Sequence, residues 1–313
     1  MSKKKLLNPK RRSPKRSGTE PAAFDRRGMD KMMTDLHRLL ESKEFDSPDE
    51  MNAFLQQIVA SGQPLPAAAP RTPLEAAQEL MYEAFEAAGQ RRIELAKEAL
   101  IVSPDCADAY SLLAEESARS LEEARALYAE GVAAGERALG PDAFAEAAGH
   151  FWGVVETRPY MRARAGLAGC LWQLGQHEEA IGHYQEMLRL NPRDNQGVRH
   201  LLLNAYLITK DDNAAERLLG EYEGDVSATW LYSGALLLYR QGKGEAKAGL
   251  QEALQHNPHV PAYLLGRKRL PRRMPAYTGF GDDSEAMYYA AEAGRLWSET
   301  EGALDWLRLL AEL

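Results

Sequence analysis

Seven histidines are the side chains of this sequence best suited to binding a metal or moving a proton. His177 and His183 are six residues apart, which places them about 120 degrees away from a common helical face. His256 and His259 flank a proline that interrupts any shared helix. No His-Glu-x-x-His pattern and no glycine-rich phosphate loop is present. We therefore expect no metal, no cofactor and no catalytic residue, and a protein that is not an enzyme.

The two cysteines give no stronger signal for chemistry. Cys170 lies in a core-like stretch, where a cysteine behaves as a small hydrophobe. Cys106 follows Pro104 near an expected helix start, where the helix dipole could lower the pKa of its thiol, but the sequence places no base beside it. So few cysteines in 313 residues suit a reducing compartment, and we expect a cytoplasmic protein.

A first basic segment, residues 150–164, gathers aromatic residues and three arginines. One interpretation makes the arginines a wall of a binding groove that pairs with partner carboxylates, while an aromatic side chain provides an anchor. The other has the aromatics fill a gap between helices and the arginines pair with acids of the same chain. The first interpretation predicts that changing Arg158 and Arg162 to Glu abolishes partner capture and leaves the thermal melt of the helices intact. The candidate partner-binding residues are Trp152, Arg158, Tyr160, Arg162 and Arg164.

A second basic segment follows near the C-terminus. A basic run in a loop broken by a proline could meet phosphate or an acidic strand. It is as compatible with a solvated loop whose bases pair with Asp282, Asp283 and Glu285. Nucleic acid is therefore the less favoured partner. The five bases of this loop are Arg267, Lys268, Arg269, Arg272 and Arg273.

Charge is divided unevenly along the chain. The net charge is −8, yet residues 1–17 hold eight bases and no acid, so the remainder carries −16. This opening stretch has little to bury, and we predict a disordered basic arm over residues 1–27. The arm could attract nucleic acid or an acidic membrane surface, or fold back on the acidic body. No apolar run long enough for a secretory signal or a membrane span is present, so we expect no membrane-spanning segment.

Two short helices are predicted after the arm. Methionines and leucines at spacings of three and four indicate a helix with one apolar stripe over residues 29–41. Ser47, Pro48 and Glu50 have the types and spacing of an N-cap, a first helical residue and a capping-box acid. Together they predict a helical hairpin over residues 28–61.

Prolines separate this hairpin from the rest of the chain. Residues 62–73 hold four prolines among alanines, which predicts an extended Pro/Ala linker. From residue 74 to 313 the sequence keeps a helical period interrupted by glycine and proline. This stretch is predicted to form one repeat domain of about six helical pairs, with an unmatched helix near residues 142–155.

The repeat is recognised by small residues, turns and terminal prolines at fixed offsets. Two units match well at a period of 34 residues, because each has a tight helix contact, a turn and a proline after the second helix. One unit contains Leu167, Ala168, Leu171, Gly175, Ala180, Tyr184 and Pro192, and the other Trp230, Gly234, Leu237, Ala246, Leu250, Ala253 and Pro258. The pattern resembles the tetratricopeptide repeat family. That resemblance implies an all-α, right-handed solenoid of helical pairs over residues 74–313 whose concave groove binds a peptide or a helix.

A narrower resemblance covers roughly residues 108–310. The segments AYSLLAEE at residues 109–116, NPHVP at 257–261, DSEA at 283–286 and EGAL at 301–304 are similar, in the same order, to stretches of the suppressor of tumorigenicity seven family. The NPHVP segment is the most specific. Animal members of that family are membrane proteins with hydrophobic N-terminal segments, which this chain does not show, so we expect a soluble relative. The resemblance implies the fold more than a biochemical activity.

These observations favour a non-enzymatic adaptor or scaffold. Stacked helical pairs form a groove whose inner side chains can hold an extended peptide or a partner helix without any chemical change. The expected partner is thus a protein or peptide. The alternative is an RNA- or ribosome-associated factor that uses the basic arm.

Overall fold

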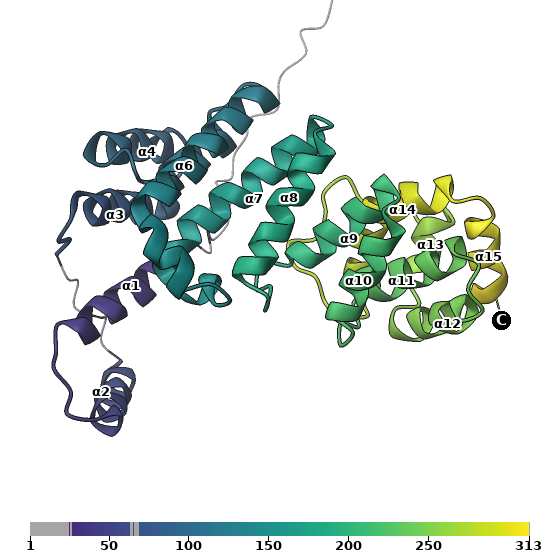
Figure 1. Cartoon of the computed structure of the whole chain (residues 1–313), viewed down its shortest axis with the longest axis horizontal. Helices are drawn as coiled ribbons and strands as arrows, with labels where there is room; N and C mark the ends of the chain where they lie inside the picture. The colour runs from purple at the N-terminus through teal and green to yellow at the C-terminus, as the bar shows by residue number, and fades with distance from the viewer. Residues whose placement is uncertain (1–24, 26, 63–64, 66–68, 313) are drawn as a thin grey trace, which may run out of the picture.

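The fold is known from a computed structural model that describes residues 25, 27–62, 65 and 69–312. In this part of the chain the structure is all-helical, which confirms the predicted all-α class (Figure 1). The helices are α1 (Gly28–Glu41), α2 (Pro48–Ser61), α3 (Pro73–Glu86), α4 (Gln90–Val102), α5 (Ala107–Glu116), α6 (Leu121–Glu146), the 3-10 turns η1 (Phe151–Gly153) and η2 (Val155–Thr157), α7 (Arg158–Gln173), α8 (His177–Leu190), α9 (Val198–Thr209), α10 (Asp212–Glu221), α11 (Ala228–Arg240), α12 (Ala246–His256), α13 (Val260–Leu264), α14 (Asp283–Glu299) and α15 (Ala303–Ala311).

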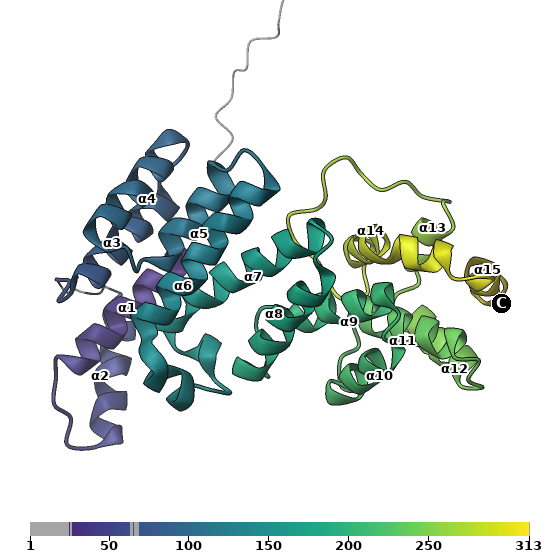
Figure 2. The same ribbon diagram turned by 45° about the horizontal axis from the view of Figure 1, so that its top comes forward.

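Consecutive helices pack side by side through most of the chain. Each helix from α3 to α11 contacts the next one in sequence, and α3 also contacts α5, α5 contacts α7, and α9 contacts α11 (Figure 2). α3, α5 and α7 thus lie beside one another, as do α9 and α11, and we call these five helices the odd row. This arrangement of adjacent helical pairs is what short connections between helices produce.

Several helix ends follow the signals in the sequence. The Ser47 hydroxyl accepts a hydrogen bond from the Glu50 amide, and Pro48 is the first residue of α2. Gly62 ends that helix in the left-handed conformation, with φ of 60°. Thr72 caps α3 in the same way as Ser47 caps α2, by accepting from the Glu75 amide. The predicted beginning and end of the second helix are confirmed.

The predicted helix at residues 142–155 is wrong. Instead α6 runs on to Glu146 through a kink at Gly140, whose φ of 69° lies outside the helical region. Pro141 lacks the amide hydrogen that would continue the helix across this point. Gly149, with φ of 90°, then turns the chain into η1 and η2. The alanine and glutamate content near residue 142 favours helix, but the glycines at both sides limit it to one short stretch.

Glycines also allow α6 and α7 to approach closely. A Cβ atom on Gly135 would lie 2.8 Å from Cβ of Tyr160, and one on Gly131 would lie 3.1 Å from Cβ of Ala163. Gly166 of α7 leaves room for the ring of Tyr128 from α6. Because these side chains are hydrogens, α7 can pack on α6 along its length and its N-terminus is fixed in place.

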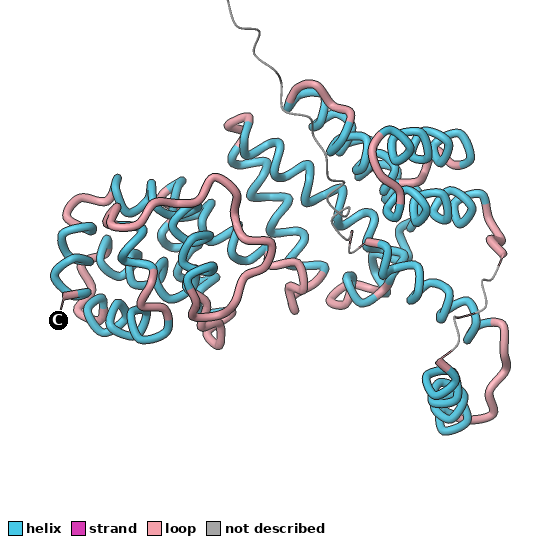
Figure 3. The backbone as a smooth tube through the Cα atoms, turned by 180° about the vertical axis from the view of Figure 1, so that it is seen from behind, coloured by secondary structure: helices cyan, strands magenta, loops and turns pink. Residues whose placement is uncertain are grey.

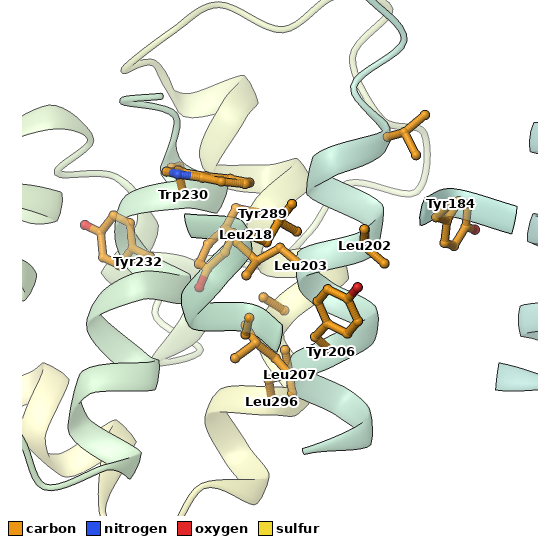
Figure 4. Packing of buried hydrophobic residues seen from close by; sticks show 14 of the residues in the cluster. Tyr184, Leu202, Leu203, Tyr206, Leu207, Leu218, Trp230, Tyr232, Tyr289 and Leu296 are labelled. Atoms are coloured by element: carbon orange, nitrogen blue, oxygen red, sulfur yellow. The ribbon is translucent and has the colours of Figure 1, made fainter. Parts of the chain in front are cut away.

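Two helices lie on the odd row at opposite ends. α14 packs across α9 and α11, and Figure 4 shows Tyr289 and Leu296 of α14 in the same buried cluster as the leucines of α9. Trp297 of α14 is fully buried. α1 packs on α3 and η2 near the other end. α2 buries none of its residues and stands away from the stack in Figure 1. Both helices of the hairpin predicted over residues 28–61 are thus present, but only α1 packs against the array.

Two separate groups of buried apolar residues stabilise the stack. The smaller is built by α3, α4 and α5 and includes Met81, Phe85 and Leu112. The larger extends from α6 to α15 and is richest in aromatic rings around Trp297. α5 joins the two groups, because it contacts both α6 and α7.

The predicted basic arm and Pro/Ala linker lie partly outside the residues that the structure describes. Residues 1–24 and 26 of the basic arm, and residues 63, 64 and 66–68 of the linker, lie outside them. Asp25 and Arg27, which the prediction included in the arm, make ion pairs with each other and with the array. Among the described residues, no helix combines the length and the apolar character that crossing a membrane requires.

Candidate functional site

An arginine pair at the start of α7 is the centre of the candidate site. Arg158 and Arg162 are one helical turn apart, so both side chains leave the same face of α7. Asp30 of α1 bridges them: Arg158 donates to its Oδ1 at 2.5 Å and Arg162 to its Oδ2 at 2.6 Å. One carboxylate of the N-terminal helix therefore pairs with both guanidinium groups.

Arg162 has a second carboxylate partner deeper in the array. Its Nε and one terminal nitrogen donate to the two oxygens of Asp108 on α5, at 2.8 and 2.6 Å. Asp108 is 0% exposed, and Gln78 of α3 donates to it as well, at 3.0 Å. Such a forked pair is the geometry in which arginine binds a carboxylate best, and it offsets the cost of burying both charges. We call Asp30, Asp108, Arg158 and Arg162 the buried ion cluster.

The rest of the contact between α1 and the array is polar as well. Thr34 shares a hydrogen bond of 2.8 Å with the Tyr82 hydroxyl, and Arg38 donates to Glu79 at 2.7 Å. Lys31 also donates to Glu79, at 2.7 Å. The buried residues of α1 are Asp30, Thr34, Asp35 and Arg38.

The apolar stripe of α1 is therefore not its buried face. Met29, Met32 and Met33 are 52%, 59% and 43% exposed. The helix itself is confirmed, but the polar face opposite the stripe is the one that meets the array. The reason is the array surface, which presents charges that only the polar face of α1 can pair.

A second ionic contact holds the residues before α1. Arg27 pairs with Glu115 at 3.0 Å and lies 4.5 Å above the ring of Phe85. Arg92 pairs with Asp25 at 3.0 Å. Burial alone would raise the pKa of Asp25, but hydrogen bonds from Arg27 and Arg92 outweigh it and lower the pKa to about 2. Asp25 is thus a permanent anion at neutral pH.

A cavity of about 380 Å³ remains beside α1, between α3, α5, α6 and α7. Leu139, Val155 and Pro159 form an apolar part of its array side, next to charged residues that include Glu75 and Glu156. His37 and Glu41 line it from α1 and make the opposite side polar. The cavity is the size of a small binding pocket, and it can receive one or two apolar side chains.

Of the five candidate residues of the first basic segment, the structure brings three together. Trp152 is half-buried, and its carbonyl accepts from Nε of Arg158 at 2.9 Å, beside Arg162. Tyr160 is buried against the rings of Phe144 and Phe151 instead. Arg164 donates to the Tyr160 hydroxyl and lies away from the ion cluster. The contacts of Arg158 and Arg162 are those of the alternative in which the arginines pair with acids of the same chain.

The second basic segment lies in the loop between α13 and α14, which runs across the C-terminal half of the molecule (Figure 3). Lys268 pairs with Asp283 at 2.7 Å, and Arg267 pairs with Glu312. Asp282 instead caps α14, and Glu285 is buried. Arg269, Arg272 and Arg273 are exposed. The loop lies far along the stack from the arginine pair and forms no common site with it.

Cys106 does not have the activated thiol that a helix start could produce. It is fully buried, and desolvation raises the pKa of its thiol to about 12. In the part of the chain that the structure describes, no three potential metal ligands come together.

One group of side chains has the composition of a hydrolytic triad. Ser227, His200 and Asp225 lie together where α9 meets the start of α11. Both Asp225, at 2.8 Å, and Ser227, at 3.5 Å, contact the same Nε2 atom of His200. A triad needs the acid on one imidazole nitrogen and the serine on the other, so this arrangement cannot pass a proton between them. Ser227 instead caps α11 by accepting from the Trp230 amide.

The NPHVP segment joins three helices. Nδ2 of Asn257 donates to the carboxylate of Glu285 at 2.8 Å and to the carbonyl of Asp282 at 3.0 Å. Its Oδ1 accepts from the amide of His259 at 3.1 Å. The segment therefore links the end of α12 and the start of α13 to the start of α14, and its visible role is structural.

Sequence reasoning missed the acids of the site. Asp30 and Asp108 were not among the candidate residues, nor was Tyr82. Asp108 carried a usable signal, because it is the one charged residue in a run of small residues from Cys106 to Ala109. An acid in such a buried-looking run needs a cation, and the arginines of residues 150–164 supply it.

Comparison with known proteins gives a consistent result. The chain matches the family model described as ST7 protein over residues 69–312. It is 30% identical over 240 residues to a suppressor of tumorigenicity 7 protein-like from Danio rerio, which covers 70% of this chain and 41% of the relative. It is 29% identical over 248 residues to the protein of that name from Homo sapiens, with 69% and 42% covered. The protein ST7 homolog of Drosophila melanogaster is 29% identical over 258 residues, with 73% and 47% covered. The chain thus spans less than half of the length of these relatives.

Proposed function

The chain belongs to the ST7 protein family, and on that premise we propose that it is a non-enzymatic adaptor or scaffold that binds a partner peptide or helix on its helical array. The names of the relatives state neither a reaction nor a partner. The array that would carry this function is, in our proposal, a right-handed solenoid of tetratricopeptide-like pairs.

The observation that carries the proposal is the contact with α1. The array holds α1 by ion pairs from Arg158 and Arg162 to Asp30 and by a hydrogen bond between Tyr82 and Thr34. A surface that binds one helix of the chain through preorganised charges has the chemistry to bind a helix of another protein. Nothing in this mode of action requires a residue to change chemically.

Affinity capture from a native lysate tests the proposal. The tagged full chain should retain a partner, and Arg158→Glu should lose it because the guanidinium that receives a carboxylate becomes an anion. Arg158 is the better choice than Arg162 because Arg162 also holds the buried Asp108. Arg295→Glu is the matched control, since Arg295 is exposed and pairs only with Glu299 of its own helix.

Two results would contradict the proposal. One is a wild-type chain that retains nothing beyond a tag-only control. The other is a partner that the Arg158→Glu and Arg295→Glu chains retain equally well while both keep the helical circular dichroism spectrum of the wild type.

A further inference from the structure

The attachment of α1 differs from that of the helices around it. α14, which lies on the same odd row, buries Tyr289, Leu296 and Trp297. α1 buries only Asp30, Thr34, Asp35 and Arg38. Apolar burial provides most of the free energy of a helix–helix contact, and α1 contributes little of it. Its attachment is therefore mainly electrostatic, and a helix that carries matching charges can replace it.

The fit of α1 to the array is also incomplete. The array side of the cavity has an apolar part at Leu139, Val155 and Pro159 among its charged residues, and α1 places only polar side chains such as His37 and Glu41 at the cavity. Met29 and Met32 of α1 are exposed to solvent. A well-matched ligand helix would put its apolar side chains into such a cavity and leave its polar ones outside. α1 satisfies the charges of this surface and leaves its apolar part unfilled.

The arginine pair and the cavity together define a helix that would fit this surface better than α1 does. An amphipathic helix with a carboxylate at the place of Asp30 would pair with Arg158 and Arg162. An apolar side chain near two turns further along, at the place of His37, would enter the cavity beside Val155. Such a helix would keep the ionic contact of α1 and add the apolar contact that α1 lacks.

We propose that the surface under α1 is a docking site for an amphipathic helix of a partner protein that carries a carboxylate for Arg158 and Arg162 and a base for Glu79, and that α1 is a reversible occupant which the partner displaces. This inference rests on the proposed adaptor function and specifies its partner. While Asp30 bridges the arginine pair, α1 covers the surface formed by α3 and α7. This surface becomes accessible to a partner when α1 leaves.

A labelled peptide tests the docking site without knowledge of the partner. The probe is a capped peptide of residues 28–43 of this chain, and its binding to the full chain is followed by fluorescence anisotropy. The Asp30→Lys chain, whose own α1 is repelled by the arginine pair, should bind the peptide about tenfold more tightly than the wild type does. Asp49→Lys on the exposed α2 makes the same charge change away from the array, and that chain should bind like the wild type.

Changes in the peptide separate the two parts of the proposal. An Asp30→Asn peptide should bind about tenfold more weakly, because it loses the charge that the arginines receive. A His37→Leu peptide should bind more tightly than the native one, by a factor of about three to ten, because leucine enters the apolar part of the cavity. Hydrogen exchange in residues 28–41 of the full chain should be faster in Asp30→Lys than in Asp49→Lys.

The outcomes that overturn the inference are specific. It fails if the peptide binds no chain variant, if Asp30→Lys and Asp49→Lys bind it equally, or if the Asp30→Asn peptide binds as well as the native one. A peptide-induced dimer in size-exclusion chromatography would instead identify a second copy of the chain as the occupant and overturn the assignment to a partner helix. Failure of lysate capture alone would contradict the adaptor function and leave these peptide results unchanged, so the two failures can be told apart.

Discussion

At the scale of single residues, the site depends on two carboxylates that share one guanidinium. Arg162 lies between Asp30 and Asp108, and each of the three has its charge matched by hydrogen bonds from its neighbours. A charge in such a place is tolerated only while its partners remain. The sequence indicated the arginines because they cluster, and it could not indicate the acids because those are more than 50 residues away along the chain.

Reversing the charge of Arg162 should therefore affect stability as well as binding. We expect Arg162→Glu to lower the free energy of unfolding by about 3–5 kcal/mol, because it leaves Asp30 and Asp108 facing a third anion. Urea denaturation followed by circular dichroism measures this change. Arg295→Glu, at an exposed site, should stay within about 0.5 kcal/mol of the wild type. The first interpretation of residues 150–164 predicted an intact thermal melt after this change, and the buried ion cluster is the reason that we now expect a loss of stability. An unchanged urea midpoint for Arg162→Glu would show that the buried ion cluster is not formed.

At the scale of helices, the sequence predicts where a helix begins better than it predicts which face of the helix is buried. The capping residues before α2 and α3 act within four residues of themselves, so local sequence is sufficient to place those helix starts. Which side of α1 is buried depends on the charges of α3 and α7, which no local pattern contains. The crossing of α14 over α9 and α11 likewise depends on packing between distant segments, and the repeat pattern did not foretell it.

The contact between α6 and α7 provides a test at this scale. Gly135→Ala should lower the free energy of unfolding by about 1–3 kcal/mol, because the new methyl group would lie 2.8 Å from Cβ of Tyr160 and push α7 away. Gly169→Ala is the matched control on α7, where an added Cβ meets no atom within 4 Å. It should raise stability by up to about 1 kcal/mol through helix propensity. Equal effects of the two substitutions in urea denaturation would show that α6 and α7 do not pack as closely as described.

At the scale of the whole molecule, the two apolar cores divide the stack into unequal parts. The N-terminal core belongs to α3, α4 and α5, and the larger core to α6 and the helices after it. The buried ion cluster lies at their junction, because Asp108 is on α5 and Arg162 on α7. A stacked array whose parts contact only their neighbours is expected to open in parts.

Hydrogen exchange followed by mass spectrometry can detect these parts. Leu112→Ala should speed exchange in α3, α4 and α5, and Leu236→Ala should speed it in α9 and later helices, since each deletes a fully buried side chain from one core only. Each variant is the control for the other. If either substitution accelerated exchange uniformly from α3 to α15, the molecule would be a single cooperative unit.

The tether between α1 and the array has a quantitative consequence for any binding measurement. Residues 42–72 connect α1 to α3, so α1 is always present at an effective concentration of about millimolar, however dilute the protein is. A partner must compete with this built-in ligand, and its apparent dissociation constant is larger than its intrinsic one by the inverse of the open fraction. A weak affinity measured on the intact chain is therefore compatible with a strong interaction at the uncovered surface.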